Sequence, residues 1–93
     1  MDSLDVYRKE IEDIDSKLVE LFEKRMDIAV KVAEYKKSNK LPIYDEERES
    51  LLIRKNVNKL SNKEYEIVLR RFFLHVMELS RSVQNDIIQN QND

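Results

Sequence analysis

The sequence has no glycine and no cysteine, and it has a single proline and a single histidine among its 93 residues. A sheet protein of this size needs turn residues, so their scarcity favours an all-α fold. The same scarcity excludes a glycine-rich phosphate loop and the dinucleotide-binding fingerprint. Without cysteine there is no disulfide, thiolate nucleophile or cysteine-based zinc site, and the lone His75 cannot form a histidine cluster. We therefore expect no metal and no cofactor.

Long apolar runs and an excess of basic charge are also missing. No apolar run approaches the roughly 20 residues that span a bilayer, and the acidic, amphipathic N-terminus MDSLDVYRKE is unlike a signal peptide. The net charge is -2, and charged residues of both signs, 39% of the chain, are interleaved. Nucleic-acid-binding domains instead carry a basic patch. The sequence predicts one cytoplasmic domain, residues 1–93, that binds neither nucleic acid nor membrane.

The first third of the chain predicts one long amphipathic helix, from about Ser3 to about Ser38, capped by Asp2 or Ser3. Its apolar stripe, spaced by three and four residues, comprises Leu4, Tyr7, Ile11, Ile14, Leu18, Leu21, Ile28, Val32 and Tyr35. Such a helix is about 54 Å long, which exceeds a compact domain of this size. The stripe therefore needs a partner, and we expect an intertwined homodimeric helical bundle of three-helix chains.

Two further helices are expected. Pro42 breaks the chain, and Asp45 can cap a second helix over about residues 46–59. The third begins at a capping-box motif, residues 61–64, and runs to about Ile88, which leaves residues 89–93 as a frayed tail. The main apolar stripe of this third helix comprises Tyr65, Leu69, Phe72, Val76, Leu79, Val83 and Ile87.

Arg25 interrupts the apolar stripe of the first helix, in the slot between Leu21 and Ile28. A buried guanidinium is costly unless it is paired, so either another side chain or an anionic ligand must neutralise it. Lys36 follows eleven residues later, on the same face and about 16 Å along the axis. Arg8 lies about 100° round the helix, so any site it serves is more readily that of a partner chain.

The other two helices also carry polar residues where they can meet a ligand. Asp45, Arg48 and Glu49 share the first turn of the second helix. Ser80 and Gln84, four residues apart, interrupt a second apolar stripe of the third helix. That second stripe also contains Phe73, Met77 and Ile88. Each feature has a plain alternative: a helix cap, a surface ion pair, or a satisfied hydrogen bond between helices.

Taken together, these residues describe a pocket with several cations, one carboxylate, one hydroxyl and one amide. It has no thiol, metal cluster or catalytic triad, so nucleophilic catalysis is poorly supported. Such a pocket suits a small, dianionic, hydroxylated ligand. It could catalyse a reaction by electrostatic stabilisation and by holding a reactive conformer, without covalent chemistry.

The ordered set of motifs resembles the all-helical, type II (AroQ) chorismate mutases, specifically the small bacterial domain that forms an intertwined dimer. The motifs are Arg8 in YRKEIEDID, Arg25 and Lys36 in LFEKRMDIAVKVAEYK, Asp45 to Glu49 in PIYDEERES, and Ser80 with Gln84 in MELSRSVQ. The resemblance covers about residues 4–88. It implies the Claisen rearrangement of chorismate to prephenate, on the route to phenylalanine and tyrosine.

The resemblance also implies roles for single residues. Arg25 and the Arg8 of a partner chain resemble the clamps on the two substrate carboxylates, and Ser80 resembles a further carboxylate contact. Lys36 and Gln84 resemble the donors to the ether oxygen, where negative charge grows as the C–O bond breaks.

The first turn of the second helix resembles the part of the family site that binds the ring hydroxyl. Glu49 resembles the acceptor of that hydroxyl, helped by the backbone at Asp45. Arg48 resembles a residue that orients Glu49 or reaches a carboxylate.

Two alternatives stay open. One is an isochorismate-pyruvate lyase, which uses nearly the same pocket on the same scaffold. The other is a non-catalytic helical dimerisation or regulatory module, which explains the long helix but not Arg25, Ser80 or Gln84. Because nothing after Gln84 resembles a fused dehydratase, dehydrogenase or regulatory domain, we expect the mutase alone. A partner enzyme of the shikimate pathway is a further candidate, since feedback control would then need another protein.

Overall fold

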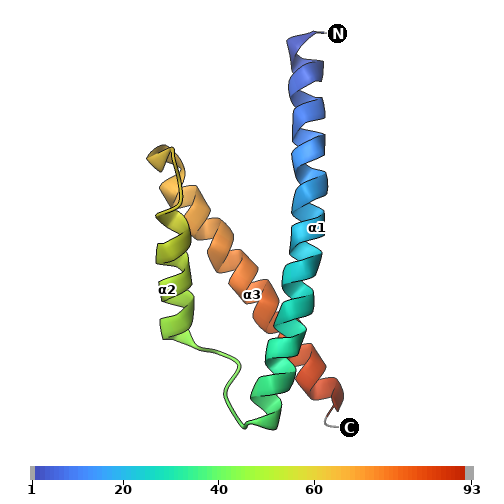
Figure 1. Ribbon diagram of the computed structural model, residues 1–93, viewed down its shortest axis with the longest axis vertical. Helices are drawn as coiled ribbons and strands as arrows, with labels where there is room; N and C mark the ends of the chain where they lie inside the picture. The colour runs from blue at the N-terminus through green and yellow to red at the C-terminus, as the bar shows by residue number, and fades with distance from the viewer. Residues whose placement is uncertain (1, 92–93) are drawn as a thin grey trace.

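The computed structural model describes residues 2–91, including the side chains of residues 2–89. Its elements are α1 (Ser3–Ser38), α2 (Glu46–Val57), the short 3-10 helix η1 (Lys63–Tyr65) and α3 (Glu66–Gln91). Figure 1 shows α1 as a long rod, with α3 crossing its C-terminal half and α2 standing apart from it. The described part of the chain contains no strand, so the predicted all-α fold with a long N-terminal helix is confirmed.

The bounds of α1 are those predicted, and its two ends follow from local hydrogen bonds. The Asp2 carboxylate accepts from the Asp5 amide at 2.8 Å and caps the first turn. At the other end the Leu41 amide donates to the Lys36 carbonyl, and the Lys40 amide to the Lys37 carbonyl. This pattern usually places a glycine in the left-handed conformation. Here Lys40 adopts it, with φ of 55°, because the chain has no glycine.

The other helices depart slightly from the predicted ranges. The Asp45 carboxylate caps α2 as predicted, accepting from the Arg48 amide at 3.0 Å, but α2 ends at Val57, two residues early. At the next start, Asn62 rather than Ser61 provides the cap, accepting from the amide two residues ahead, and a 3-10 turn precedes α3. Residues 89–91 are helical rather than frayed, while 92–93 lie outside the described residues.

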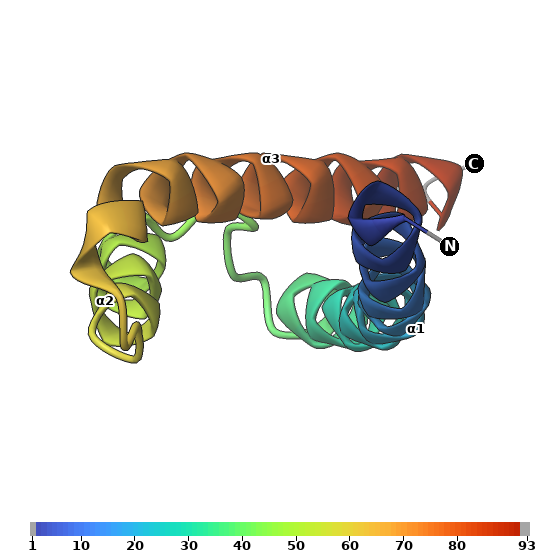
Figure 2. The same ribbon diagram turned by 90° about the horizontal axis from the view of Figure 1, so that it is seen from above.

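Helix α3 holds the fold together, because it contacts both α1 and α2. Seen from above, α1 and α2 lie on the same side of α3 (Figure 2). Ile53 and Val57 of α2 pack on Met77 of α3 in the main core cluster. Where α1 crosses α3, the buried residues of α1 are Met26, Ala29 and Ala33. Two alanines allow the helices to approach closely, since helix separation depends on the side chains at the contact.

The two apolar stripes of α3 are buried to different extents. Met77, Ser80 and Gln84 of the second stripe of α3 are buried within the chain, as is Val76 of its main stripe, whereas Tyr65, Phe72 and Leu79 of that main stripe are about half exposed, at 57%, 49% and 51%. Ile28 of the α1 stripe is 55% exposed, which agrees with the expectation that this stripe is not covered within a single chain. The exposed apolar residues of both helices thus lie away from the intrachain contact, where Met26 and Ala29 of α1 and Val76 and Met77 of α3 are buried.

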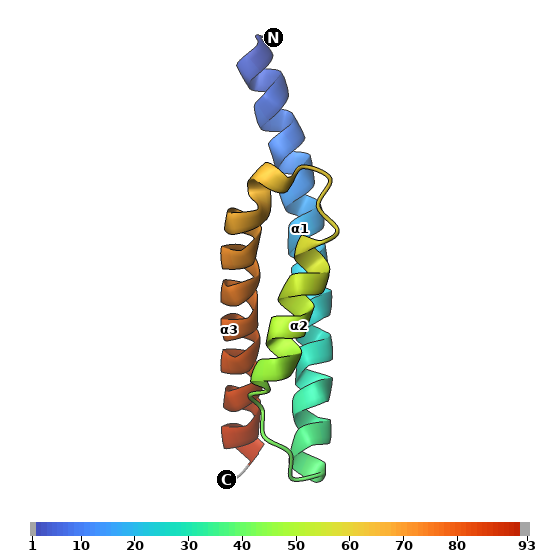
Figure 3. The same cartoon turned by 90° about the vertical axis from the view of Figure 1, so that its left-hand side faces the viewer.

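The N-terminal half of α1 extends beyond the rest of the chain (Figures 1 and 3). The radius of gyration is 16.8 Å, against about 12–13 Å for a compact domain of this length. The exposed apolar residues on this half are Leu4, Val6, Tyr7, Ile11, Ile14, Leu18, Val19 and Leu21. The predicted overhang is therefore confirmed. No helix within residues 2–91 is long and apolar enough to cross a membrane.

Candidate active site

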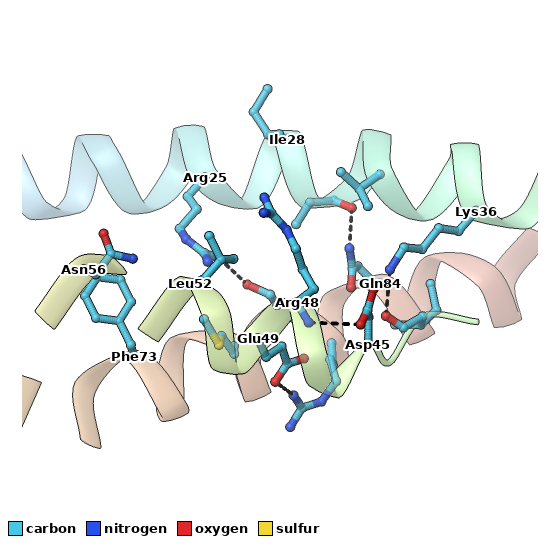
Figure 4. Close-up of a pocket in the computed structure, with 16 residues that line it drawn as sticks. Arg25, Ile28, Lys36, Asp45, Arg48, Glu49, Leu52, Asn56, Phe73 and Gln84 are labelled. Carbon is cyan, nitrogen blue, oxygen red and sulfur yellow. Dashed lines mark hydrogen bonds and ion pairs between the residues drawn. The ribbon is translucent and has the colours of Figure 1, made fainter. Parts of the chain in front are cut away.

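A cavity of about 490 Å³ opens between α1, α2, the middle of α3 and the connection that follows α1. Seven of the eight predicted site residues line it: Arg25, Lys36, Asp45, Arg48, Glu49, Ser80 and Gln84. Arg25 and Lys36 extend into it from α1, while Arg48 extends from α2 toward α1 (Figure 4). Helical spacing therefore brought Arg25 and Lys36 to one site, as their shared face predicted.

Arg25 is hydrogen-bonded to a neutral group. Its Nη1 donates to the Ser80 hydroxyl at 2.7 Å. That hydroxyl lies 2.9 Å from the Val76 carbonyl, to which it can donate its single proton. No carboxylate among residues 2–89 forms an ion pair with Arg25. The described part of this chain therefore contains no structural salt bridge to Arg25, and the positive charge of Arg25 is left for another partner.

Gln84 is buried, at 7% exposure, and its side-chain amide is fixed in orientation. Its Nε2 donates to the Ala29 carbonyl of α1 at 2.9 Å. Because a carbonyl can only accept, the nitrogen and not the oxygen must face Ala29. One N–H of the amide remains for a ligand. The predicted hydrogen bond between helices and a second contact to a ligand are thus compatible.

Lys36 ties α1 to the connection between α1 and α2. Its ammonium donates to the Ile43 carbonyl at 3.0 Å. An ammonium has three N–H donors, so two remain for other acceptors on the cavity side. Ile43 also lines the cavity. The contact therefore shapes the cavity wall and places a cation in it at the same time.

The start of α2 contributes three further charged residues, Asp45, Arg48 and Glu49. The carboxylate of Asp45 caps the helix through the Arg48 amide, so the predicted cap role is confirmed, and Asp45 also lines the cavity. The Arg48 side chain forms no ion pair with a carboxylate of residues 2–89. The alternative of a surface ion pair for Arg48 is therefore not what the structure contains.

Arg81 is a cavity residue that sequence reasoning missed. Its Nη1 forms a short ion pair with Oε1 of Glu49, and its guanidinium lies 4.7 Å from the ring centroid of Tyr44. The hydrogen bond to Glu49 raises the pKa of Arg81 above its ordinary value. A signal was available: Arg81 follows Met77 by four residues and precedes Gln84 by three, so it lies on the buried stripe.

Arg8 is not among the residues that line the cavity. It lies on the exposed, overhanging half of α1, seventeen residues before Arg25, or about 26 Å along the helix axis. That separation exceeds the length of an arginine side chain several times over. The structure therefore does not bring Arg8 to the cavity of its own chain.

The cavity is positively charged, although the chain as a whole is not. Its lining includes four cations, Arg25, Lys36, Arg48 and Arg81, and two carboxylates, Asp45 and Glu49. The formal net charge of the lining is therefore +2, while that of the whole chain is -2. Opposite charges in a partly enclosed cleft attract each other more strongly than in water. The cavity is thus complementary to a dianion.

The residues present limit the chemistry of the cavity. His75 is exposed and lies beside Glu78 on the surface of α3, so it does not activate Ser80. Within residues 2–91 there is no group of three or more histidine, cysteine or acidic side chains that could hold a metal. What the cavity offers is a set of cationic and amide donors with two carboxylates, of which Asp45 caps α2 and Glu49 pairs with Arg81. Such a set binds anions and stabilises developing negative charge.

A family model and a curated relative both place the chain in the same family. The model of the family described as chorismate mutase type II matches residues 7–85. The chain is 38% identical over 74 residues to the bifunctional chorismate mutase/prephenate dehydratase of Buchnera aphidicola subsp. Schizaphis graminum (strain Sg). That match covers 77% of this chain but 19% of the relative, so the chain spans about a fifth of that protein's length. No solved structure gives a significant match.

Proposed function

We propose that this chain, which belongs to the chorismate mutase type II family, catalyses the rearrangement of chorismate to prephenate. One observation carries the proposal: a cavity with a formal net charge of +2 gathers seven of the eight residues that the family resemblance singles out. Its volume of about 490 Å³ lies within the roughly 300–1,000 Å³ that is usual for small-ligand sites. Chorismate carries two carboxylates and a ring hydroxyl, which match the cations and the carboxylate of the cavity.

The reaction needs positioning rather than proton transfer. It is unimolecular: the ether C–O bond breaks while a C–C bond forms, and every atom of the substrate is kept. A rate enhancement of about a millionfold needs about 8 kcal/mol of transition-state stabilisation. Clamping both carboxylates selects the reactive conformer, and donors aimed at the ether oxygen stabilise the charge that grows there.

The residues divide these tasks as follows. Arg25 binds one substrate carboxylate with its guanidinium fork, supported by Ser80. The ammonium of Lys36 and the remaining N–H of Gln84 donate to the ether oxygen. Glu49 accepts the hydrogen bond of the ring hydroxyl. The support for these roles is the set of contacts described above, which leaves donors of Lys36 and Gln84 unused.

Arg48 and Asp45 complete the polar wall on α2. Arg48 extends toward α1 across the cavity (Figure 4), so it can reach a substrate carboxylate. Asp45 positions the start of α2, and with it Glu49, through its helix cap.

A homodimer would cover the exposed apolar surfaces of the chain and supply a clamp for the second substrate carboxylate. The overhanging half of α1 exposes a row of apolar residues, of which Ile14 is 57% exposed, and Tyr65, Phe72 and Leu79 of the main stripe of α3 are about half exposed as well. Two chains that pack these surfaces together would bury them, in keeping with the hydrophobic effect. In such a dimer the overhang of one chain would carry Arg8 toward the cavity of the other. The second substrate carboxylate would then have its clamp.

The deciding experiment is a product analysis. Purified protein is incubated with chorismate and, separately, with isochorismate, against a blank without protein. We expect prephenate from chorismate, at a rate far above the blank. Salicylate and pyruvate from isochorismate, without prephenate from chorismate, would favour the lyase on the same scaffold. No consumption of either substrate would favour a non-catalytic module. The cytoplasmic location, the biosynthetic pathway, action as the mutase alone and any partner enzyme stay predictions.

A further inference from the structure

Arg81 is the one charged cavity residue to which the family resemblance gives no role. It stands on α3 directly after Ser80, with its side chain 28% exposed, and it pairs with Glu49 of α2, whose side chain is 20% exposed. Figure 4 shows this ion pair as the dashed line below Glu49. The pair joins α3 to α2, and its two residues are 32 positions apart in the sequence.

The surroundings of Arg81 fix its guanidinium from a second side. The ring of Tyr44, in the connection before α2, lies 4.7 Å from the guanidinium carbon, within the range of a cation–π contact. Arg81 therefore touches α2 through Glu49 and the connection through Tyr44. Partly buried charges are screened less by salt than exposed ones, and charge-assisted hydrogen bonds are among the strongest in proteins. Together these contacts define one orientation of the pair.

We propose that Arg81 is a positioning residue: it engages one oxygen of Glu49 and thereby presents the other to the hydroxyl of the substrate. This inference rests on the proposed function, because it assumes that Glu49 accepts the ring hydroxyl of chorismate. A carboxylate has two oxygens with several acceptor sites, and Arg81 bonds Oε1. Oε2 remains to accept the ring hydroxyl.

The physical benefit is preorganisation. A glutamate side chain has several rotatable bonds, and the freedom it loses on binding opposes the binding of substrate. Arg81 removes part of that freedom, since it holds one oxygen of Glu49. Support of this kind behind a contacting residue is what keeps a site in productive geometry.

A double-mutant cycle tests the inference. We compare Arg81→Gln, Glu49→Gln and the double variant, measuring kcat and KM on chorismate. We expect Arg81→Gln to lower kcat/KM about 10- to 100-fold, and the double variant to stay within about threefold of Glu49→Gln alone. Arg81→Lys keeps the charge but not the fork, so it should recover part of the loss. Losses that multiply in the double variant, or an unaffected Glu49→Gln, overturn the proposal.

The deoxy analogue of chorismate, which lacks the ring hydroxyl, separates positioning from a general structural effect. With this substrate the loss caused by Arg81→Gln should shrink to less than about threefold, because the hydrogen bond that Arg81 prepares no longer exists. An undiminished loss contradicts the proposal. Circular dichroism and melting curves check folding, and Arg81→Lys takes the place of Arg81→Gln in the cycle if the latter unfolds.

A matched control is available on the same helix. Arg70 of α3 pairs with Glu66 at 3.6 Å and does not line the cavity. Arg70→Gln should leave kcat and KM unchanged, and an equal loss in this variant overturns the proposal. The wild-type protein distinguishes the two levels of inference. If it leaves chorismate unchanged, the proposed function fails and this inference with it; if it is active but the losses multiply, only the role of Arg81 fails.

Discussion

The Arg25 guanidinium of α1 donates a hydrogen bond of 2.7 Å to the Ser80 hydroxyl of α3, 55 residues further along the chain. Both residues had stood out as polar interruptions of apolar stripes, and the contact explains why they occur together. The serine holds the arginine in place without neutralising it. A carboxylate at the same place would have held it equally well but cancelled the charge that an anionic substrate needs.

Arg25→Leu separates catalysis from folding. A leucine continues the apolar stripe and leaves Ser80 with its Val76 carbonyl partner, so the free energy of unfolding should change by no more than about 1 kcal/mol. We expect kcat/KM on chorismate to fall at least about 100-fold, because a carboxylate clamp in the cavity is lost. Enzyme kinetics and urea denaturation measure the two quantities.

The control for this prediction is the residue before Arg25. Lys24 is exposed and pairs with Glu20 on the surface of α1, so Lys24→Leu should leave kcat/KM nearly unchanged. If Arg25→Leu keeps full turnover, the cavity does not use Arg25. If it unfolds the protein, the arginine is structural.

Gln84 predicts how activity depends on pH. Its amide donates whatever the pH, so turnover should vary little between about pH 6 and 8. Gln84→Glu should behave differently, because the new carboxyl group is buried and faces the Ala29 carbonyl. Burial and that carbonyl both disfavour the charged form and raise its pKa, and only the protonated form can donate.

The raised pKa sets the direction of the pH dependence in the Gln84→Glu variant. The Gln84→Glu variant should be most active at low pH and lose both activity and melting temperature as the pH rises and the group ionises. Rate profiles and melting curves over the same buffers test this. A wild-type protein that loses its activity steeply across neutrality, or a variant with a flat profile, contradicts the proposed donor.

Helix periodicity explains what the sequence could predict of the site. The angles between Arg25 and Lys36, and between Ser80 and Gln84, are properties of one helix, so they do not depend on how the chain folds. Which stripe of α3 meets α1 does depend on the fold. Both stripes of α3 are apolar. Which of them packs against α1 depends on how the helices are arranged, and the spacing of residues within one helix does not specify that arrangement. The sequence therefore predicts both stripes of α3 but does not specify which of them meets α1.

Contacts between elements lay beyond the sequence for the same reason. Arg81 was overlooked because a charged residue on a helix usually faces solvent, and its pairing with Glu49 depends on where α2 lies. The bond from Lys36 to the Ile43 carbonyl depends on the path of a connection, which Lys40 starts in an unusual backbone conformation. Helical periodicity predicts neither the path of this connection nor the pairing of Arg81 with Glu49.

Lys36→Met should affect both turnover and stability. The substitution keeps most of the apolar stem but removes the ammonium, which bonds the Ile43 carbonyl. We expect kcat to fall at least about 100-fold as the cation beside the ether oxygen is lost. Loss of the hydrogen bond should cost about 1 kcal/mol, or a melting temperature lower by about 4–8 °C. Steady-state kinetics and calorimetry measure these effects.

Lys31 provides the comparison, since it is an exposed lysine of the same helix that does not line the cavity. Lys31→Met should leave kcat as it is. Unchanged turnover in Lys36→Met would exclude the proposed stabilisation of the ether oxygen, whatever happened to the melting temperature.

The place of Arg8 in the proposed dimer can be tested by mixing two inactive variants. In a symmetric dimer each site would combine Arg25 of one chain with Arg8 of the other. Arg8→Ala and Arg25→Ala homodimers should therefore both be nearly inactive. When they are unfolded together and refolded, half of the dimers are mixed, and each mixed dimer has one intact site and one doubly altered site. About a quarter of the wild-type activity should return.

The distances in one chain are what make this outcome decisive. Arg8 lies about 26 Å from Arg25 along α1, so a monomer has no means of bringing both to one substrate. Sedimentation equilibrium should give twice the chain mass for the wild type and for each variant, which shows that lost activity does not reflect lost assembly. If mixing restores no activity while the dimers remain intact, Arg8 does not serve the partner's cavity. If Arg8→Ala alone keeps full turnover, the second carboxylate is bound by a residue of the cavity itself, and Arg48 is the cation best placed to do so.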